Sequence, residues 1–354
     1  MSSYSEGPVN ALRRIAFLLE RGREETYKVK AFRNAAGSVL TVPADELRAH
    51  AEAGTLRSIP GVGASTAKVV EQALRGEVPD RLAALEQEYA GPLADGGQEL
   101  RALLRGDLHS HSDWSDGGSP IEEMAFTAME LGHDYLVLTD HSPRLTVANG
   151  LSAARLARQL EVVEAVNAHV VSTGSTTDSF RLLRGIEVDI LDDGSLDQTE
   201  EMLARLDVRV ASVHSKLRMD AAAMTRRMLG AVRNPFTNVL GHCTGRLVTG
   251  GRGTRPQSEF DARAVFEACA EHDVAVEINS RPERRDPPTD LLELARDIGC
   301  LFSIDSDAHA PGQLDFLDHG CARAVAAGIE PERIVNTWAA DRLVAWADRA
   351  TPNG

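Results

Sequence analysis

The sequence predicts an α/β protein in which a mostly parallel sheet follows a small all-α domain. From residue 104 onward, short apolar runs typical of strands alternate with helical stretches, whereas the first 90 residues show helical spacing alone. Histidine and carboxylate residues follow almost every strand-like run. The length of 354 residues allows two domains or one barrel plus an appendage, and 43% hydrophobic and 26% charged residues are typical of a globular protein.

The amino-terminal region reads as a series of short helices. Apolar residues recur at helical spacing in NALRRIAFLLERG, in YKVKAFRNAAGSVL and around residues 45–53. A Pro-Gly turn then interrupts LRSIPGVGASTAKVVEQALRG, and residues 79–89 form a last helix. The segment GPLADGG follows. We therefore expect a helical domain over residues 1–92, a linker over 93–103 and a second domain over 104–350.

The second domain alternates between two kinds of segment. Strands are predicted at 104–109, 135–140, 182–190, 208–214, 238–242, 274–279 and 300–305. Helices are predicted at 120–132, 152–171, 196–206, 219–231, 258–272 and 289–298. Strands separated by helices pair in parallel, and the sheet is either closed as a barrel or open. In such sheets, functional groups collect beyond the carboxyl ends of the strands.

Nine candidate metal ligands lie at those carboxyl ends, and six of the seven strand-like segments supply one to three of them. They are His109, His111, Asp116, His141, Glu187, His214, His242, Asp307 and His309. Alternation along a strand places both imidazoles of His109-x-His111 on one side. Imidazole and carboxylate groups bind borderline and hard divalent cations. Each residue alone reads as an ordinary loop residue, but together they predict a metal site.

The motifs of this domain resemble those of the PHP (polymerase and histidinol phosphatase) superfamily. The matching segments, in order, are GDLHSHSDWSDG, LTDHS, GIEVDI, ASVHS, GHCTGR, EINS and IDSDAH. The resemblance implies a distorted (β/α)7 barrel that binds two to three divalent ions (Mn, Zn or Fe) through the nine residues. It makes Glu187 the bridging carboxylate and gives Asn279 a supporting role.

Such a cluster makes phosphoester hydrolysis the expected chemistry. Paired cations stabilise the attacking and leaving oxygens of an in-line displacement and activate water at neutral pH. We expect Glu187 and Asp307 to be catalytic in this sense. Arg246, four residues after His242, and Lys216, two after His214, are candidates to bind the phosphate, with Arg281 as a third.

The amino-terminal domain resembles a helix-hairpin-helix and the small lyase domain of family X DNA polymerases. Gly61 and Gly63 in PGVG permit a tight turn, and the following helix begins with free N–H groups that bind phosphate without reading bases. The resemblance places the Schiff-base lysine of the lyase on Val69, and Lys68, one position away, points about 100° elsewhere on the helix. We therefore predict DNA binding rather than lyase chemistry. The candidate phosphate contacts are Lys68, Lys28, Lys30 and Arg33.

Net charge, domain spacing and cysteine content limit the classes of function that the protein can have. The net charge of −15 argues against a generally basic nucleic-acid coat, but residues 1–94 hold 12 basic and 12 acidic side chains, so the excess of acid lies further along. Only about ten residues separate the two domains, which leaves no room for a polymerase body. Four widely spaced cysteines, no secretion signal and no long apolar run suit a cytoplasmic protein without a membrane partner.

Three functions are compatible with these features. The first is a metal-dependent phosphoesterase that acts on DNA, as a 3′→5′ exonuclease or in 3′-end or abasic-site processing during DNA repair. The second is a small-molecule phosphomonoesterase, such as a histidinol-phosphate phosphatase, for which the amino-terminal domain would have no purpose. The third is a non-catalytic DNA-binding protein with a structural metal cluster. Intact candidate ligands at all nine positions favour an enzyme.

Overall fold

The computed structural model describes residues 7–89, 91–172, 180–251 and 253–348. The chain forms two compact units, Met1–Pro92 and Leu93–Gly354. Among the described residues, none of the helices combines the length and the apolar character needed to cross a bilayer.

The amino-terminal unit is all helical. Its elements are α1 (Pro8–Arg21), α2 (Thr26–Leu40), α3 (Ala44–Glu52), the short 3-10 helix η1 (Leu56–Ser58), α4 (Ala64–Leu74) and α5 (Asp80–Tyr89). Helix α1 packs against α2, α4 and α5. Its Leu12, Ile15, Leu18 and Leu19 are fully buried because they recur at the spacing of one helical face. The predicted helices of this region are confirmed.

The PGVG turn connects η1 to α4. Gly61 adopts the left-handed conformation, with φ of 81°, that favours glycine. Gly63 is the N-cap of α4, and its backbone N–H donates to Thr66 Oγ1 at 2.9 Å. Val69 is buried, with 1% of its surface exposed. The helix thus starts at an exposed glycine, and the position aligned with the lyase lysine faces the interior.

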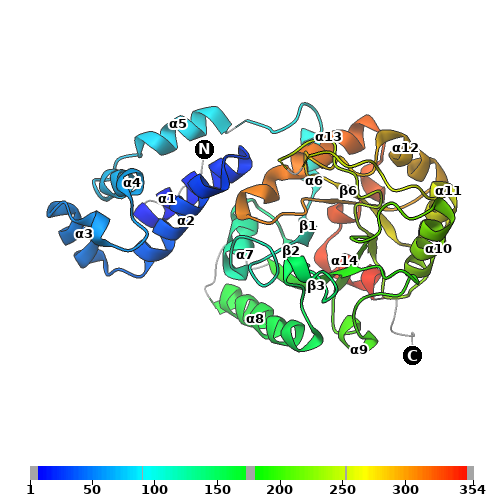
Figure 1. Cartoon of the computed structure of the whole chain (residues 1–354). Helices are drawn as coiled ribbons and strands as arrows, with labels where there is room; N and C mark the ends of the chain where they lie inside the picture. The colour runs from blue at the N-terminus through cyan, green and yellow to red at the C-terminus, as the bar shows by residue number, and fades with distance from the viewer. Residues whose placement is uncertain (1–6, 90, 173–179, 252, 349–354) are drawn as a thin grey trace. The chain divides into compact units, whose positions relative to one another are not determined.

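The second unit is a seven-stranded parallel barrel (Figure 1). Its strands are β1 (Gly106–Ser110), β2 (Tyr135–Leu138), β3 (Arg181–Asp189), β4 (Val208–Ser212), β5 (Val239–Leu240), β6 (Ala275–Asn279) and β7 (Phe302–Asp305). Each strand pairs in parallel with the next in the chain, so the sheet order equals the sequence order. All seven predicted strands and the α/β fold class are confirmed.

Helices cover the outside of this barrel. Those between strands are α7 (Ile121–Glu130), α8 (Ala153–Ser172), α9 (Glu200–Leu203), α10 (Ala221–Val232), α11 (Ala262–Glu271) and α12 (Thr289–Ile298), with the 3-10 turn η2 (Thr146–Ala148) before α8. The helix expected over residues 196–206 is shorter, because Leu196 pairs with Ile190 in an isolated β-bridge and Thr199 caps α9 through a side-chain bond to Met202 N–H.

Several elements outside the strand–helix alternation were not expected. The stretch expected as a linker contains α6 (Gln98–Leu103), whose Leu100 is buried in the core of the barrel unit. After β7 the chain continues through η3 (Pro311–Phe316), α13 (Leu317–Ala326), η4 (Pro331–Arg333), η5 (Val335–Thr337) and α14 (Ala340–Ala347). These short elements carry too few periodic apolar residues to be recognised from their pattern alone.

The barrel is closed between β1 and β7 by a side chain as well as by backbone. An isolated bridge, Ser110 to Ala308, joins the two edges, and Leu108 N–H of β1 donates to Asp305 Oδ1 of β7 at 3.0 Å. Between the strands themselves, the side-chain amide of Asn336 in η5 donates to Gly106 O of β1 (3.1 Å) and to Ile304 O of β7 (2.8 Å). Its oxygen accepts from Ile304 N–H (2.8 Å). Asn336 therefore satisfies backbone groups that a regular strand pair would satisfy, which makes the barrel distorted.

Candidate metal centre

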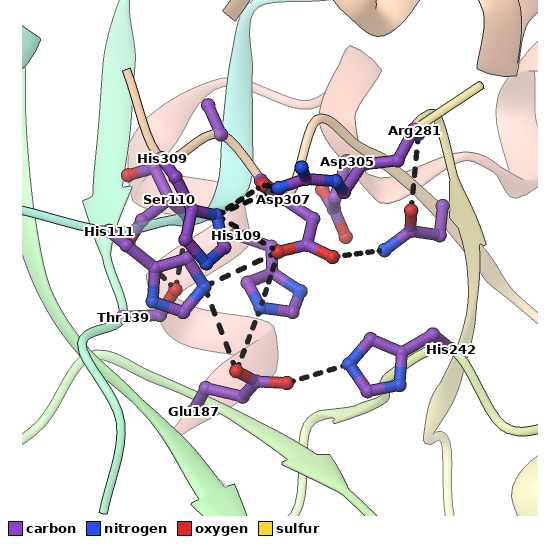
Figure 2. A network of polar contacts seen from close by, with 12 residues as sticks. His109, Ser110, His111, Thr139, Glu187, His242, Arg281, Asp305, Asp307 and His309 are labelled. Atoms are coloured by element: carbon purple, nitrogen blue, oxygen red, sulfur yellow. Dashed lines mark hydrogen bonds and ion pairs between the residues drawn. The ribbon is translucent and has the colours of Figure 1, made fainter. Parts of the chain in front are cut away.

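The nine predicted ligands lie together at the carboxyl ends of the barrel strands. His109 belongs to β1 and Glu187 to β3, and the other seven follow strand ends. Figure 2 shows His109, His111, Glu187, His242, Asp307 and His309. Because parallel strands all end on the same face, residues nearly 200 positions apart in sequence meet there. The nine side chains, called the metal cluster below, are His109, His111, Asp116, His141, Glu187, His214, His242, Asp307 and His309.

Glu187 lies at the middle of the metal cluster. Its Oε2 is 2.8 Å from His141 Nδ1, 3.4 Å from His109 Nε2 and 3.6 Å from His111 Nε2. The other oxygen, Oε1, faces the remaining two imidazoles. It is 3.1 Å from His214 Nε2 and 2.9 Å from His242 Nε2. A carboxylate with imidazoles on both oxygens has the geometry of a bridging ligand.

Two further carboxylates complete the metal cluster. Asp307 Oδ1 is 3.4 Å from His111 Nε2 and 3.6 Å from His309 Nδ1. Asp116 Oδ1 is 3.4 Å from both His141 Nε2 and His309 Nε2.

The donor atoms fall into three groups that could each hold an ion. They are His111 with Asp116, His141 and His309; His109 with His111 and Asp307; and His141 with Glu187 and His214. Within each group the donor atoms lie within 4.8 Å of one another. Since His111 and His141 each belong to two groups, adjacent sites would share ligands.

The pKa shifts in the metal cluster show that its carboxylates are stabilised by positive charge on their neighbours. Burial would raise the pKa of Glu187, but the imidazoles of His214, His109 and His141 outweigh it and hold that pKa well below its usual range. Burial likewise would lower the pKa of His141, yet Glu187 and Asp116 raise it to about 10. Without cations, protonated imidazoles such as His141 would have to balance the charge of Glu187. Metal binding would displace those protons.

Unpaired polar atoms in the metal cluster fit divalent cations. Among the described residues, His109 Nε2, both ring nitrogens of His111 and of His214, and Glu187 Oε2 are buried without a hydrogen-bond partner. Buried polar atoms are rarely left unpaired, and leaving several in one place costs free energy unless an ion or water satisfies them. The donor set of imidazole and carboxylate suits Zn, Mn or Fe.

Two buried carboxylates that were not predicted orient the imidazoles. His109 donates from Nδ1 to Glu277 Oε1 at 2.6 Å, which directs Nε2 toward Glu187 and Asp307. Asp189 Oδ1 accepts from His214 N–H at 3.1 Å and lies 3.3 Å from His214 Nδ1. Such contacts set the tautomer and ring orientation of metal-binding histidines.

Another buried carboxylate, Asp140, holds the loop that carries Asp116. It accepts from Ser112 N–H (2.9 Å), Ser112 Oγ (2.6 Å) and Gln159 Nε2 (2.6 Å), and from the Ser115 hydroxyl. Asn279, expected as a supporting residue, donates from Nδ2 to Asp307 Oδ2 at 3.1 Å. The loop and Asp307 are thus fixed by partners outside the cluster.

Two arginines reach the metal cluster. Arg281, the third candidate from sequence, donates from Nη1 to Asp307 O and His309 Nδ1, each at 2.9 Å (Figure 2). Arg284, which was not predicted, donates from Nε to Asp307 Oδ2 at 3.0 Å. Both come from the loop after β6.

The structure does not place the two preferred phosphate-binding candidates at the cluster. Arg246 donates to the backbone carbonyls of Arg284 and Arg285, and Lys216 pairs with Asp192 at the surface. Among the described residues, neither side chain contacts a member of the metal cluster. Proximity in sequence to a ligand was a poor guide, because the loop conformation decides where a long side chain points.

The predicted DNA contacts of the amino-terminal unit differ in accessibility. Lys30 is exposed, and Lys68 is exposed in a surface pair with Asp80 at 2.8 Å. Lys28 pairs with Glu24 at 2.6 Å, one helical turn away. Arg33, however, forms a largely buried ion pair with Glu20 at 2.7 Å, with 13% of its side chain exposed. Arg33 is therefore the least accessible of the four candidates, and its contact with phosphate stays a prediction.

Comparison with protein families gives two matches. Residues 6–78 match the helix-hairpin-helix domain, and residues 107–281 match the PHP domain. Together with a parallel barrel and a cluster of imidazoles and carboxylates at its strand ends, these matches define a class: metal-dependent phosphoesterases built on a barrel.

Individual relatives agree with this class. The "DNA polymerase/3'-5' exonuclease PolX" of Bacillus subtilis is 36% identical over 233 residues, which cover 66% of this chain but 39% of that protein. A protein of Aeromonas hydrophila named "Probable phosphatase" is 30% identical over 240 residues, covering 65% of this chain and 88% of that protein. The chain belongs to the PHP family of metal-dependent phosphoesterases. It thus spans about two fifths of the polymerase relative and most of the phosphatase relative.

A solved structure is also similar to part of this chain. It is a histidinol phosphate phosphatase from Lactococcus lactis complexed with zinc, L-histidinol and phosphate. The sequence identity is 18% and the TM-score 0.44, with 64% of this chain and 94% of that chain covered.

Proposed function

We propose that this chain is a metal-dependent phosphoesterase that acts on DNA, as a 3′→5′ exonuclease or in the processing of 3′ ends and abasic sites during DNA repair. The amino-terminal unit binds the strand by its phosphates, and the barrel cleaves a phosphodiester at the metal cluster. The match to a helix-hairpin-helix domain and the likeness to the polymerase/exonuclease support a nucleic-acid substrate. Four buried free cysteines are compatible with a reducing cytoplasm.

The observation that carries the proposal is the position of Glu187. One buried carboxylate faces five imidazoles, and three overlapping groups of donors surround it. Such a centre would hold two to three ions through its nine side chains. Divalent cations bound there would supply Lewis-acid charge and a nucleophile at neutral pH, which hydrolysis of a phosphoester requires.

The protein's own residues supply position and charge around that centre. Glu277 and Asp189 hold the imidazoles of His109 and His214 in one orientation. Arg284 uses Nε for Asp307, and among the described residues its Nη groups have no hydrogen-bond partner, so they remain for a phosphate oxygen. A guanidinium beside the cluster stabilises the negative charge that develops on the phosphate.

A small-molecule phosphomonoesterase is a second candidate. The relative named "Probable phosphatase" aligns over 88% of its own length, so a protein of about the size of the barrel unit carries that name. Under this alternative the helix-hairpin-helix unit would contribute nothing to turnover. A non-catalytic protein with a structural metal cluster is a third candidate, which predicts tightly bound metal and no hydrolysis.

Metal content, a substrate panel and a truncation separate these candidates. Elemental analysis after reconstitution should find two to three ions per chain, and less than one would contradict the metal centre. With Mn, the full chain should cleave recessed, abasic or single-stranded oligonucleotides in preference to histidinol phosphate. Removing residues 1–95 should weaken oligonucleotide binding more than hydrolysis of p-nitrophenyl phosphate. Equal losses would argue against a separate binding unit.

A further inference from the structure

Arginines gather on one rim of the barrel, next to the metal cluster. They come from the loop after β5 and the loop after β6, and they are Arg246, Arg255, Arg281, Arg284 and Arg285, called the arginine rim below. This charge is unusual in its setting, because the chain has a net charge of −15 and its acidic excess lies after residue 94. Between residues 238 and 258 the sequence contains no aspartate or glutamate.

Three of these arginines lack a carboxylate partner. Arg281 pairs with Glu283 at 2.7 Å and Arg284 with Asp307 at 3.0 Å. Among the described residues, Arg246, Arg255 and Arg285 form no ion pair. Arg246 and Arg255 donate to backbone carbonyls, such as Arg255 Nε to Gly245 O at 2.6 Å, which leaves further donors unused. The carboxylate that acts on both side chains, Asp286, is buried and accepts from Thr244.

Backbone hydrogen bonds hold the two loops that carry the arginine rim. Leu247 and Arg255 exchange two backbone hydrogen bonds of 2.9 Å, and Val248 N–H donates to Glu283 O at 2.7 Å. The first two bonds close the loop after β5 on itself, and the bond from Val248 to Glu283 joins it to the loop after β6. Burial, followed by the nearby charge of Arg284, lowers the pKa of Arg255, which agrees with like charges held close together. Holding like charges together costs free energy unless an anion occupies the space between them.

The arginine rim continues directly from the metal cluster. Arg284 contacts Asp307, and the next residue, Arg285, is exposed and has the left-handed φ of 48°. Consecutive Cα atoms lie about 3.8 Å apart. The Arg285 backbone is therefore close to Arg284, which contacts the metal cluster, and the Arg285 side chain can reach a phosphate next to the one at the cluster. A phosphomonoester has one phosphate, which the metal cluster would take. Cationic groups beyond it match the further phosphates of a polynucleotide strand.

We propose that the arginine rim is a second substrate site, which binds the phosphates of the nucleic-acid strand that adjoin the phosphodiester in the metal cluster. This inference rests on the proposed function and names which part of the barrel distinguishes a polynucleotide from a small phosphoester. Arg255 and Arg285 make the phosphate contacts. Arg246 holds the rim in shape through the carbonyls of Arg284 and Arg285.

The test uses the full chain with manganese and a double variant, Arg255→Ala with Arg285→Ala. Neither residue touches the metal cluster. The matched control is Arg158→Ala with Arg263→Ala, which removes the same charge from exposed positions on α8 and α11. Cleavage of a fluorescein-labelled single-stranded oligonucleotide is compared with hydrolysis of p-nitrophenyl phosphate. Each is measured from 50 to 200 mM salt.

The rim variant should raise KM for the oligonucleotide on the order of tenfold and should leave kcat/KM for p-nitrophenyl phosphate within about twofold. The slope of log affinity against log salt should fall by about 0.7 for each lost phosphate contact. The control should match the wild type. A third variant, Arg255→Lys with Arg285→Lys, keeps the charge and should recover most of the salt slope.

Two results would overturn the inference while leaving the proposed function intact. One is a rim variant that cleaves the oligonucleotide with wild-type KM and salt slope. The other is an equal loss on both substrates, which would mean that these arginines support the fold or the metal cluster. Failure of the proposed function looks different: the wild type would hydrolyse p-nitrophenyl phosphate and leave every oligonucleotide intact. That result overturns the arginine rim as a strand site as well.

Discussion

The barrel and the amino-terminal unit handle charge in opposite ways. In the barrel, Glu187 and Asp307 are buried, and each has several partners at fixed distances. In the amino-terminal unit, Lys30 and Lys68 stand in solvent, and the Lys68–Asp80 pair leaves 65% and 68% of its side chains exposed. A buried cluster fails when one member changes, whereas exposed charges act additively and are screened by salt. Mutations should therefore have large effects in the barrel and small effects in the amino-terminal unit.

Asp307→Asn should have the largest effect. The change removes one carboxylate charge from the metal cluster while keeping the shape, and asparagine tolerates the φ of 51° at this position. Hydrolysis of p-nitrophenyl phosphate should fall by about 10²–10³-fold or more. The exposed Asp297→Asn is the control. Retained turnover with a normal thermal melt would contradict the role of Asp307.

Glu277→Gln should have an intermediate effect. The amide cannot accept all the bonds that Glu277 receives from His109 Nδ1, His242 N–H and Asn279 Nδ2. Zinc affinity, measured by competition with a chelator, should fall by about 10–100-fold. The exposed Glu293→Gln should bind zinc as the wild type does. An unchanged affinity in Glu277→Gln would show that the orientation of His109 does not depend on this carboxylate.

His133 should make the stability of the barrel unit pH-dependent. It is buried at the end of α7, and burial followed by the charge of Arg101 lowers its pKa to about 3. An unfolded histidine takes up its proton near pH 6.5, so the unfolded chain binds more protons between these values. The free energy of unfolding should therefore decrease as pH falls below 6.5, by at most about 1.4 kcal/mol per pH unit from this residue.

Urea unfolding of metal-free protein at pH 7, 6 and 5 tests this expectation. His133→Gln should flatten the decrease, and His169→Gln, an exposed control on α8, should not. An unchanged pH dependence in the His133 variant would show that other groups cause it.

Lys30→Ala with Lys68→Ala should have the smallest effect. If each lysine contacts one phosphate, oligonucleotide affinity should fall a few-fold and the salt slope by about 0.7 per contact on single strands. Hydrolysis of p-nitrophenyl phosphate should not change. Fluorescence anisotropy with Arg48→Ala as the control measures this. A loss of 100-fold or more would mean that the amino-terminal unit also depends on a fixed, buried arrangement.

The sequence was informative where functional residues occur at regular places in the fold, namely at the ends of the strands. All seven strands could be predicted, and the nine polar residues at their ends meet in the structure because parallel strands share one face. Glu277 and Asp189 could not be found this way. Each lies within an apolar strand, and the contact from residue 109 to 277 spans 168 positions without any local signal.

The positions of long side chains in loops could also not be predicted from the sequence. Arg246 and Lys216 follow ligands closely in the chain, yet Arg284, 42 positions after ligand His242, donates to the carboxylate of Asp307. Asn336 was missed for a related reason. Its amide substitutes for a strand pair, and no composition or spacing marks such a role.

Asn336 ties the activity of the barrel to a part of the chain that holds no candidate ligand. His109 and His111 lie at the carboxyl end of β1, and Asp307 and His309 follow the carboxyl end of β7. The distance between these two pairs is therefore maintained in part by one carboxamide some thirty residues downstream, together with the Ser110–Ala308 bridge and the bond from Leu108 N–H to Asp305 Oδ1. Substitutions in η5 should consequently appear in a genetic screen as loss of catalysis, although every group that takes part in the reaction is still present.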